Sequence, residues 1–479
     1  MNAWLSEHWV LAVALAGYIA MLAVNANVGR RASVSLPDYY VGGRNMGGFA
    51  VGMSFFATFA STNSYIGHTG KGYEYGLPWL TLGVLIIAFT FLSWVTIAPK
   101  LRRFAAHWDA LTLPDYLAAR FGAQSGTLRG FAALIIVVSS LLYLVAIFKG
   151  SGNLFQAFFD IPYSLAIGLT LAIVMLYTTV GGFVSVVRTD VVQGTLMVLG
   201  SVIIFYCVTN AAGGPGAIVQ LAEHAESRWL FTWDAGIPFV VLVGIALSGS
   251  LKLLVDPRQV SRFYALRDEK SVRVGISVSV VGITIIMCCL FPVGLYAHLL
   301  LTDVQDTDLI MPTFLSMAGV FPVWVADILV VAIVAAAMSS MDSVLLVAAS
   351  VLYKDIIEPA RAAARPMAWT RFGVVGFAVI AALIALNPPG GIVEITIFSG
   401  SLYAACFFPA IVFGLHWQRG SAAAVVASMI AGIVVLLGWL LLGGRAITHE
   451  VFPALLASCL AYALLARRTP SALQDWPAG

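Results

Sequence analysis

Charged residues are scarce in this chain. Only 10% of its 479 residues are Asp, Glu, Lys or Arg, whereas 60% are hydrophobic. A soluble domain carries about 25% charged residues, and the mean hydropathy of +0.94 points the same way. The composition therefore excludes a soluble globule with a large core and predicts a protein that crosses a membrane many times.

The chain also lacks the motifs of metal, redox or nucleotide chemistry. Its five cysteines stand apart in apolar segments, without the spacing of a metal site or a disulfide framework, so we interpret them as small core residues. The absence of a glycine-rich phosphate loop argues against ATP as the energy source. The first apolar run follows an acidic stretch without a small-residue cleavage site, which predicts a retained span. Only a short tail follows Arg468, and we expect no appended signalling domain.

Apolar segments long enough to cross ~30 Å of hydrocarbon recur along the chain. They predict an all-α polytopic membrane protein. Two segments that mix charged with apolar residues, 108–121 and 258–270, are interpreted as short interfacial helices on the inner side. The thirteen predicted spans are 8–28, 48–70, 78–98, 128–157, 163–180, 184–210, 236–254, 273–297, 323–350, 368–386, 391–414, 421–442 and 450–466.

Lys and Arg are distributed unequally between the two ends of these spans. If the N-terminus is placed outside, only four of the 26 Lys and Arg residues fall on or near the outer side. The others gather at the inner side, as the positive-inside rule requires. We therefore predict a protein of the cell (inner) membrane with its N-terminus outside and its C-terminus in the cytoplasm. The four outer residues are Lys71, Lys149, Arg228 and Arg445.

Two spans carry sequences that interrupt a helix. Hydroxyl and amide side chains crowd the middle of the second span, from Ser54 to Ser64, and compete for its backbone hydrogen bonds. In the seventh span, Ser248-Gly249-Ser250 is expected to break the helix just before Lys252. Transporters bind substrates and ions where helices break at membrane depth. A glycine kink that serves packing alone is the alternative at each place.

The two interruptions lie five spans apart, which is the separation that two inverted repeats of five spans would give. We therefore expect one transmembrane domain over residues 1–479, with an extra N-terminal helix at 8–28. Repeat one would cover about 48–210, repeat two about 236–414, and the C-terminal helices about 421–466.

The ninth span contains Ser339, Asp342 and Ser343, which share one helix face by their spacing of three and four residues. That face offers hard oxygen ligands, which alkali cations prefer, and an ionisable residue at bilayer depth indicates an ion or substrate path. A packing face of small residues is the alternative. Asp190 in the sixth span is a second buried carboxylate candidate, with a salt bridge to Arg188 as its alternative.

Several motifs together resemble those of the sodium:solute symporter family. Each is weak alone, but they follow one another in the family's order and spacing over about residues 38–355. Around 57–76 the chain looks most like the pantothenate and monocarboxylate members, whereas the similar proline-transporting members carry an aspartate in place of Phe59. The motifs are Asp38-Tyr39-Tyr40-Val41-Gly42-Gly43-Arg44, Leu111-Thr112-Leu113-Pro114-Asp115-Tyr116, Gly181-Gly182 followed by Thr189-Asp190, Asp256-Pro257-Arg258-Gln259-Val260-Ser261-Arg262-Phe263, and Met338-Ser339-Ser340-Met341-Asp342-Ser343.

The resemblance implies the LeuT-like inverted-repeat fold that the family shares with amino-acid symporters. It also implies a sodium ion between the broken second span and the ninth span. The positions that match its ligands are the carbonyls of Ala57, Ala60 and Ala336 and the hydroxyls of Ser339 and Ser340. Some members bind a second cation deeper, at positions that match Asp190, Ser339, Asp342 and Ser343. Because Asp342 departs from the serine or threonine of other members, this position is left open between sodium, a proton and a hydrogen bond alone.

The leading hypothesis is secondary symport, in which a sodium gradient drives the import of a small organic solute. A small carboxylate is the favoured solute. The alternatives are an amino acid such as proline or a sugar as the solute, a sensor without transport, and a channel-like facilitator. Paired ion ligands on opposed helices favour alternating access over an open pore. The expected partners are sodium, the solute and the lipid bilayer, with no nucleic acid and no enzymatic reaction. Solute contacts are expected from Ser61, Thr62, Asn63, Ser139, Tyr143, Ser248, Ser250, Lys252 and Tyr403.

Lys252 supplies a separate reason to expect a carboxylate. It follows the predicted interruption of the seventh span, and no acidic residue lies one turn before it. Its ammonium would then reach the carboxylate of the solute from the inward side. The alternative is that Lys252 pairs with Asp256, four residues later, or extends to the inner interface.

Overall fold

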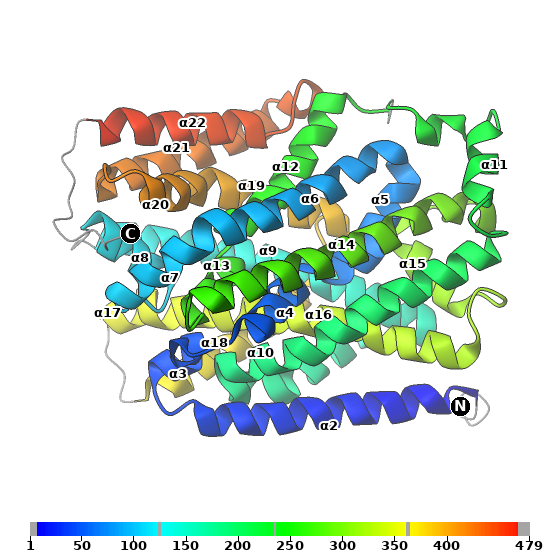
Figure 1. The fold of residues 1–479 in the computed structure, drawn as a ribbon, viewed down its shortest axis with the longest axis horizontal. Helices are drawn as coiled ribbons and strands as arrows, with labels where there is room; N and C mark the ends of the chain where they lie inside the picture. The colour runs from blue at the N-terminus through cyan, green and yellow to red at the C-terminus, as the bar shows by residue number, and fades with distance from the viewer. Residues whose placement is uncertain (1–6, 123–125, 234–235, 361–364, 468–479) are drawn as a thin grey trace.

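The computed structural model describes residues 7–122, 126–233, 236–360 and 365–467. These residues form helices joined by turns, with no strand among them. The long helices run side by side, and α2 begins at the end of the bundle opposite to the end where α22 finishes (Figure 1). The helices are α2 Trp9–Ala32, α3 Leu36–Val41, α4 Gly48–Phe59, α5 His68–Tyr75, α6 Leu80–Leu92, α7 Ala98–His107, α8 Leu113–Phe121, α9 Gly126–Phe159, α10 Tyr163–Ala211, α11 Ala217–Glu223, α12 Phe239–Val255, α13 Pro257–Ala265, α14 Glu269–Leu300, α15 Ile310–Ser316, α16 Val323–Val351, α17 Glu358–Ala360, α18 Pro366–Ala385, α19 Ile392–Phe408, α20 Gly414–His416, α21 Ala422–Leu441 and α22 Val451–Ala466.

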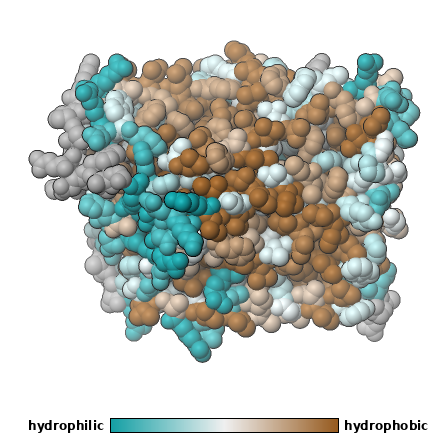
Figure 2. All heavy atoms as spheres, in the orientation of Figure 1, coloured by the Kyte–Doolittle hydropathy of each residue, from teal (hydrophilic) through white to brown (hydrophobic). Residues whose placement is uncertain are grey.

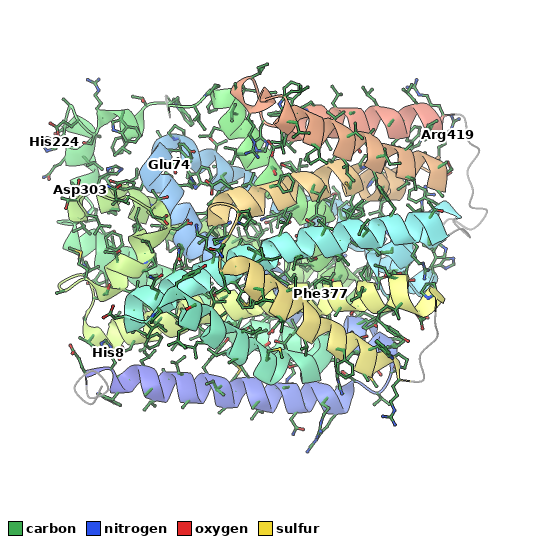
Figure 3. All side chains as sticks on the ribbon, turned by 180° about the vertical axis from the view of Figure 1, so that it is seen from behind. His8, Glu74, His224, Asp303, Phe377 and Arg419 are labelled. Carbon is green, nitrogen blue, oxygen red and sulfur yellow. The ribbon has the colours of Figure 1, made fainter. Side chains whose placement is uncertain are left out.

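The predicted all-α membrane fold is confirmed. Ten helical stretches in the described part of the chain are long and apolar enough to cross a membrane, and the shorter apolar helices Gly48–Phe59, Tyr163–Met175 and Val451–Ala466 coincide with the three remaining predicted spans. A broad hydrophobic surface covers the face between the two more polar ends (Figure 2). His224 and Asp303 lie at one end and Arg419 at the other, with Phe377 between them (Figure 3).

Both segments expected to be interfacial helices form helices that are largely buried in the protein. The first forms α8, which begins with Thr112 as its cap in a reciprocal hydrogen-bonded pair with Asp115. The second forms α13, which continues the seventh span. Its arginines are paired inside the protein, so their charge does not place it at the membrane surface.

The helix α10 contains two predicted spans and reverses its direction at Gly182. Thr178 donates a hydrogen bond to Asp342 at 2.5 Å, and Ser339 donates one to Asp190 at 2.5 Å. Residues 178 and 190 would lie about 18 Å apart along a straight helix, whereas 339 and 342 lie about 4.5 Å apart along α16. The chain therefore folds back at Gly182, whose φ of 61° and ψ of −170° interrupt the helical backbone.

Replacement of Gly182 by alanine is expected to destabilise the fold by about 1–3 kcal/mol, because this backbone region is essentially reserved for glycine. A Cβ atom here would also lie 2.7 Å from Tyr39 Cδ2 and 2.9 Å from Ser33 Oγ. Gly168→Ala is the matched control, since a Cβ at that helical position in α10 meets nothing within 4 Å. Thermal unfolding of the purified variants measures the difference, and equal midpoints would contradict the reversal at Gly182.

Candidate functional site

The second span is broken where its hydroxyl-rich sequence predicted. The helix α4 closes with the hydrogen bond from the Ala60 amide to the Phe56 carbonyl, at 2.8 Å, and Ala60 is extended with ψ of 104°. The Ser61 hydroxyl then accepts the Asn63 amide at 3.1 Å. A π-helical turn at Asn63–Gly67 leads into α5. Because a helix leaves its last carbonyls without partners of its own, Ala57 and Ala60 present carbonyl oxygens at the break.

The prediction that Ser248-Gly249-Ser250 breaks the seventh span is wrong. The helix α12 continues through these residues, and the break comes at Asp256, which is extended with ψ of 123°. Pro257 explains this position, because proline forces the residue before it out of the helical region. The Ser250 hydroxyl bonds back to the Ala246 carbonyl at 2.7 Å, and Ser248 bonds across to α19. These hydroxyls are satisfied within or between intact helices.

The serines of α16 face the end of α4. Ser340 donates to the Thr58 carbonyl at 3.1 Å, and the Thr58 and Ser343 hydroxyl oxygens lie 2.9 Å apart. The hydroxyls of α16 and the end-of-helix carbonyls of α4, both hard oxygen ligands, are therefore adjacent and shielded from water. The five residues predicted to bind the first sodium ion, all 0% exposed, are Ala57, Ala60, Ala336, Ser339 and Ser340.

Asp190 lies at the junction of four helices and is completely buried. Its Oδ1 accepts the Ser339 hydroxyl and its Oδ2 accepts the Ser54 hydroxyl, each at 2.5 Å. The cation beside it is Arg262 of α13, whose Nη2 lies 3.6 Å from Oδ2. Arg188, the alternative partner, instead donates to Asn25 of α2 at 3.1 Å.

The Asp342 carboxylate bonds to a different part of the fold from the Asp190 carboxylate. Its Oδ1 accepts the Thr178 hydroxyl from the first half of α10. Ser343, by contrast, accepts a hydrogen bond from the Arg262 guanidinium and donates to the Ser339 carbonyl at 2.9 Å. Of the four residues expected around a second cation, the structure joins Ser339 to Asp190 and brings Asp190 and Ser343 to one arginine. It turns the fourth, Asp342, toward another helix.

Lys252 is 5% exposed and lies beside the break of the second span. Its ammonium nitrogen is 5.1 Å from the centroid of the Phe59 ring and 5.6 Å from that of Tyr143, distances that suit a cation–π interaction. Asp256 does not neutralise it, because this carboxylate accepts hydrogen bonds from the Arg258 Nε at 2.9 and 3.0 Å. Within the described residues no carboxylate forms an ion pair with Lys252 within 4.0 Å.

Arg258 has a place in this site that the sequence motif did not reveal. Its guanidinium carbon lies 3.6 Å from the centroid of the Tyr143 ring. Its Nη1 is buried and has no hydrogen-bond partner among the described residues. An arginine near an inner helix end is normally interpreted as a surface residue. The only signal in the sequence that Arg258 is buried in an ion pair is Asp256, two residues before it.

The other predicted solute contacts form two groups. Near the break, Ser61 accepts the Tyr143 hydroxyl at 3.2 Å, while the side-chain oxygens of Thr62 and Asn63 are buried without partners in the described structure. A second group joins helices to one another. In it Ser139 pairs with Ser399 at 2.7 Å, Tyr403 with Ser140 at 3.1 Å, and Ser248 with Ser401 at 2.9 Å.

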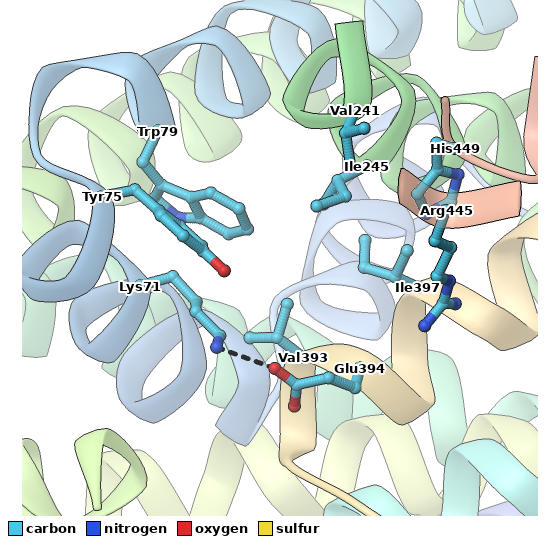
Figure 4. A pocket seen from close by; sticks show the side chains of 10 residues that line it. All are labelled: Lys71, Tyr75, Trp79, Val241, Ile245, Val393, Glu394, Ile397, Arg445 and His449. Atoms are coloured by element: carbon cyan, nitrogen blue, oxygen red, sulfur yellow. Dashed lines mark ion pairs between the residues drawn. The ribbon is translucent and has the colours of Figure 1, made fainter. Parts of the chain in front are cut away.

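A cavity of about 170 Å³ lies between α5, α12, α19 and the segment that joins α21 to α22 (Figure 4). Lys71 reaches across it to Glu394 at 2.7 Å, and Arg445 pairs with Glu450 at 2.7 Å. Burial lowers the pKa of His449, in the wall of the cavity, to about 4, so this imidazole is neutral at pH 7. Of the helices that line it, α5 lies toward the end of the bundle that holds α11 (Figure 1).

Comparison with known proteins places this geometry in a family. The family model described as "Sodium:solute symporter family" matches residues 39–432. The osmoregulated proline transporter of Bacillus subtilis is 30% identical over 93% of this chain and 92% of its own length. The sodium/pantothenate symporter of Escherichia coli is 29% identical over 90% of both chains.

Solved structures confirm the predicted fold. A Na+-coupled sialic acid symporter in a substrate-bound outward-open state superposes with a TM-score of 0.82, at 23% identity, over 97% of this chain and 99% of that one. A nucleobase-cation-symport-1 family transporter in a closed conformation gives 0.56 at 14% identity, over 91% and 96%. Both likenesses show the LeuT-like inverted-repeat architecture with broken helices. The chain therefore belongs to the sodium:solute symporter family, whose members are membrane transporters rather than enzymes, and sodium is its coupling ion.

Proposed function

We propose that this protein imports a small carboxylate together with sodium by alternating access. The observation that carries the solute class is Lys252, a buried ammonium without an ion-pair partner among the described residues, next to the break of the second span. Arg258 adds a second buried cation on the same tyrosine ring, and Asp256 compensates only one of the two charges. A buried charge is costly unless it is paired, and a carboxylate of the solute supplies the missing partner.

The first sodium ion is proposed to bind at the end of α4. The carbonyls of Ala57, Ala60 and Ala336 would provide three ligands, and the hydroxyls of Ser339 and Ser340 two more. The adjacency of Ser340 to the end of α4 supports this assignment. Substrate contacts are proposed for Ser61, Thr62, Asn63, Tyr143 and Lys252, which surround the break. Ser139, Ser248 and Tyr403 instead join neighbouring helices, and Ser250 bonds within its own helix.

The orientation and the repeat boundaries are parts of the same proposal. With the N-terminus outside, the cavity of Figure 4 would face the exterior and admit the solute. The repeats at about 48–210 and 236–414 would each begin with a broken span, α4–α5 and α12–α13 respectively.

A zwitterionic amino acid is the competing solute, because the relative from Bacillus subtilis is a proline transporter. Such a solute needs an anionic partner for its ammonium group. Asp256, the carboxylate four residues after Lys252, already forms hydrogen bonds with Arg258. This pairing favours a solute that has a carboxylate but no ammonium group.

Proteoliposome uptake tests the proposal directly. Purified protein is expected to accumulate a labelled small carboxylate when an inward sodium gradient is imposed, and not with choline in place of sodium. Unlabelled carboxylates should compete in this assay and proline should not. Accumulation without a sodium gradient would indicate a facilitator, and competition by proline alone would establish the amino-acid alternative.

Ser340→Ala is expected to raise the sodium concentration for half-maximal uptake about 3- to 10-fold, because one oxygen ligand is lost. The maximal rate at saturating sodium should change little. Ser350→Ala is the matched control on α16, since the Ser350 hydroxyl is buried without a hydrogen-bond partner in the described residues. If Ser339→Ala and Ser340→Ala both keep the sodium dependence of the wild type, the site lies elsewhere.

A further inference from the structure

Arg262 lies among the oxygen atoms of the proposed second cation position. Its guanidinium is 1% exposed, and its Nε donates to the Ser54 hydroxyl at 3.2 Å. Its Nη2 donates to Ser343 and lies 3.6 Å from the Asp190 carboxylate. The positive charge that faces Asp190 in this structure therefore belongs to the chain itself.

Apart from the Arg258 carbonyl and the Ser261 hydroxyl of its own helix, the oxygen atoms near this guanidinium come from other helices. Asp190 is on α10, Ser339 and Ser343 are on α16, and Thr58 and Ser54 are on α4. Ser339 donates to one carboxylate oxygen and Ser54 to the other, each at 2.5 Å. One carboxylate with several hydroxyls is a ligand set that suits a hard monovalent cation. A guanidinium and a sodium ion repel each other strongly at low dielectric, so one carboxylate does not hold both.

Arg262 is carried by a helix that is joined to its span by a break. The nine-residue helix α13 begins at Pro257, directly after the extended Asp256. Arg262 Nη1 donates to the Arg258 carbonyl at 2.8 Å, a bond inside α13, so the side chain moves with its helix. Breaks of this kind absorb the backbone rotation when a segment shifts. A displacement of α13 would remove the arginine and leave the oxygen atoms in place.

We propose that Arg262 is a tethered cation that occupies the second cation position, and that a second sodium ion binds at Asp190 only when α13 withdraws the arginine. The inference rests on the proposed second cation position and names what regulates access to it. It links sodium binding to the seventh span, because α13 begins directly after Asp256 and carries Arg258, which pairs with Asp256 beside Tyr143. Binding of this sodium thereby releases the half-helix that borders the solute site.

Equilibrium binding of ²²Na⁺ to the purified protein tests the inference without any knowledge of the solute. The wild type should bind one equivalent tightly and a second one weakly. Arg262→Gln removes the competing charge and should lower the half-saturating concentration of the second equivalent about tenfold or more, as expected for the loss of a buried ionic competitor. Asp190→Asn added to this variant should abolish the second equivalent and leave the first unchanged.

Arg267→Gln is the matched control, because it removes an arginine two residues after α13 whose side chain is 59% exposed and pairs with Asp268. It should bind sodium as the wild type does. The same binding curve for Arg262→Gln and the wild type would overturn the inference, as would a second equivalent that survives in the double variant. If the wild type bound no sodium at all, this result would contradict both the proposed first sodium site and this inference.

Hydrogen exchange of the wild type decides the matter if Arg262→Gln does not yield folded protein. Backbone amides of 257–265 should exchange faster in saturating sodium than in choline, because sodium at Asp190 releases α13. The segment 269–300 serves as the internal reference. Exchange of 257–265 that does not respond to sodium would show that Arg262 is a fixed structural partner of Asp190.

Discussion

Lys252→Met is expected to abolish the preference of the transporter for an acid over its neutral amide. The variant keeps the apolar stem against Phe59 and Tyr143 and removes only the charge. Loss of one partner from a buried charge pair costs about 2–5 kcal/mol, which weakens binding of the acid roughly 30-fold or more. Affinity for the amide should hardly change. Competition by acid and amide against uptake of the labelled acid measures both affinities in proteoliposomes.

Lys71→Met is the matched control for this experiment. Lys71 lies in the wall of the cavity and already pairs with Glu74 and Glu394, at 2.6 and 2.7 Å, so its loss should leave the preference for the acid intact. Wild-type affinity of Lys252→Met for the acid would assign Lys252 a structural role. The case for a carboxylate would then depend on family resemblance alone.

Hydropathy predicted the membrane fold because each span has to satisfy its own backbone in the bilayer, and this requirement leaves a long apolar signature. The break in the second span was also readable, because the Ser61 hydroxyl satisfies the backbone amide of Asn63 locally. Local sequence determines both features. The same reasoning failed at Ser248-Gly249-Ser250, where the hydroxyls find partners at Ala246 and on α19. Proline carried the stronger local constraint, and the break lies at Asp256, directly before Pro257.

The buried arginines show the limit of reasoning from charge alone. Arg258 and Arg262 count as inner-surface residues by the positive-inside rule, yet they are 2% and 1% exposed. Their partners Asp256 and Asp190 are respectively 2 and 72 residues away in sequence. The near partner leaves a local signal, whereas the distant one depends on how α10 folds back at Gly182. Residues that share a helix face by their spacing likewise need not bond to the same neighbour, as Asp342 and Ser343 bond to different helices.

Asp256→Ala is expected to destabilise the protein by about 3–5 kcal/mol, because it leaves the buried guanidinium of Arg258 without its counter-charge. Asp256 is 0% exposed, binds Arg258 through both carboxylate oxygens, and caps α13 through the Arg258 amide at 2.9 Å. The matched control is Asp268→Ala. Asp268 likewise caps a helix, α14, through the Ser271 amide at 2.7 Å, but its ion pair with Arg267 is exposed.

A double-mutant cycle separates the ion pair from the cap. Asp256→Asn with Arg258→Gln replaces both charges by amides of similar shape, and removal of a whole buried pair costs far less than removal of one member. Chemical or thermal unfolding in a fixed detergent should therefore place the double variant closer to the wild type than either single variant. Additive losses would mean that Arg258 finds another counter-charge when Asp256 is gone. Recovery would show that Asp256 compensates the charge of Arg258 at the break and leaves Lys252 as the uncompensated charge that the solute meets.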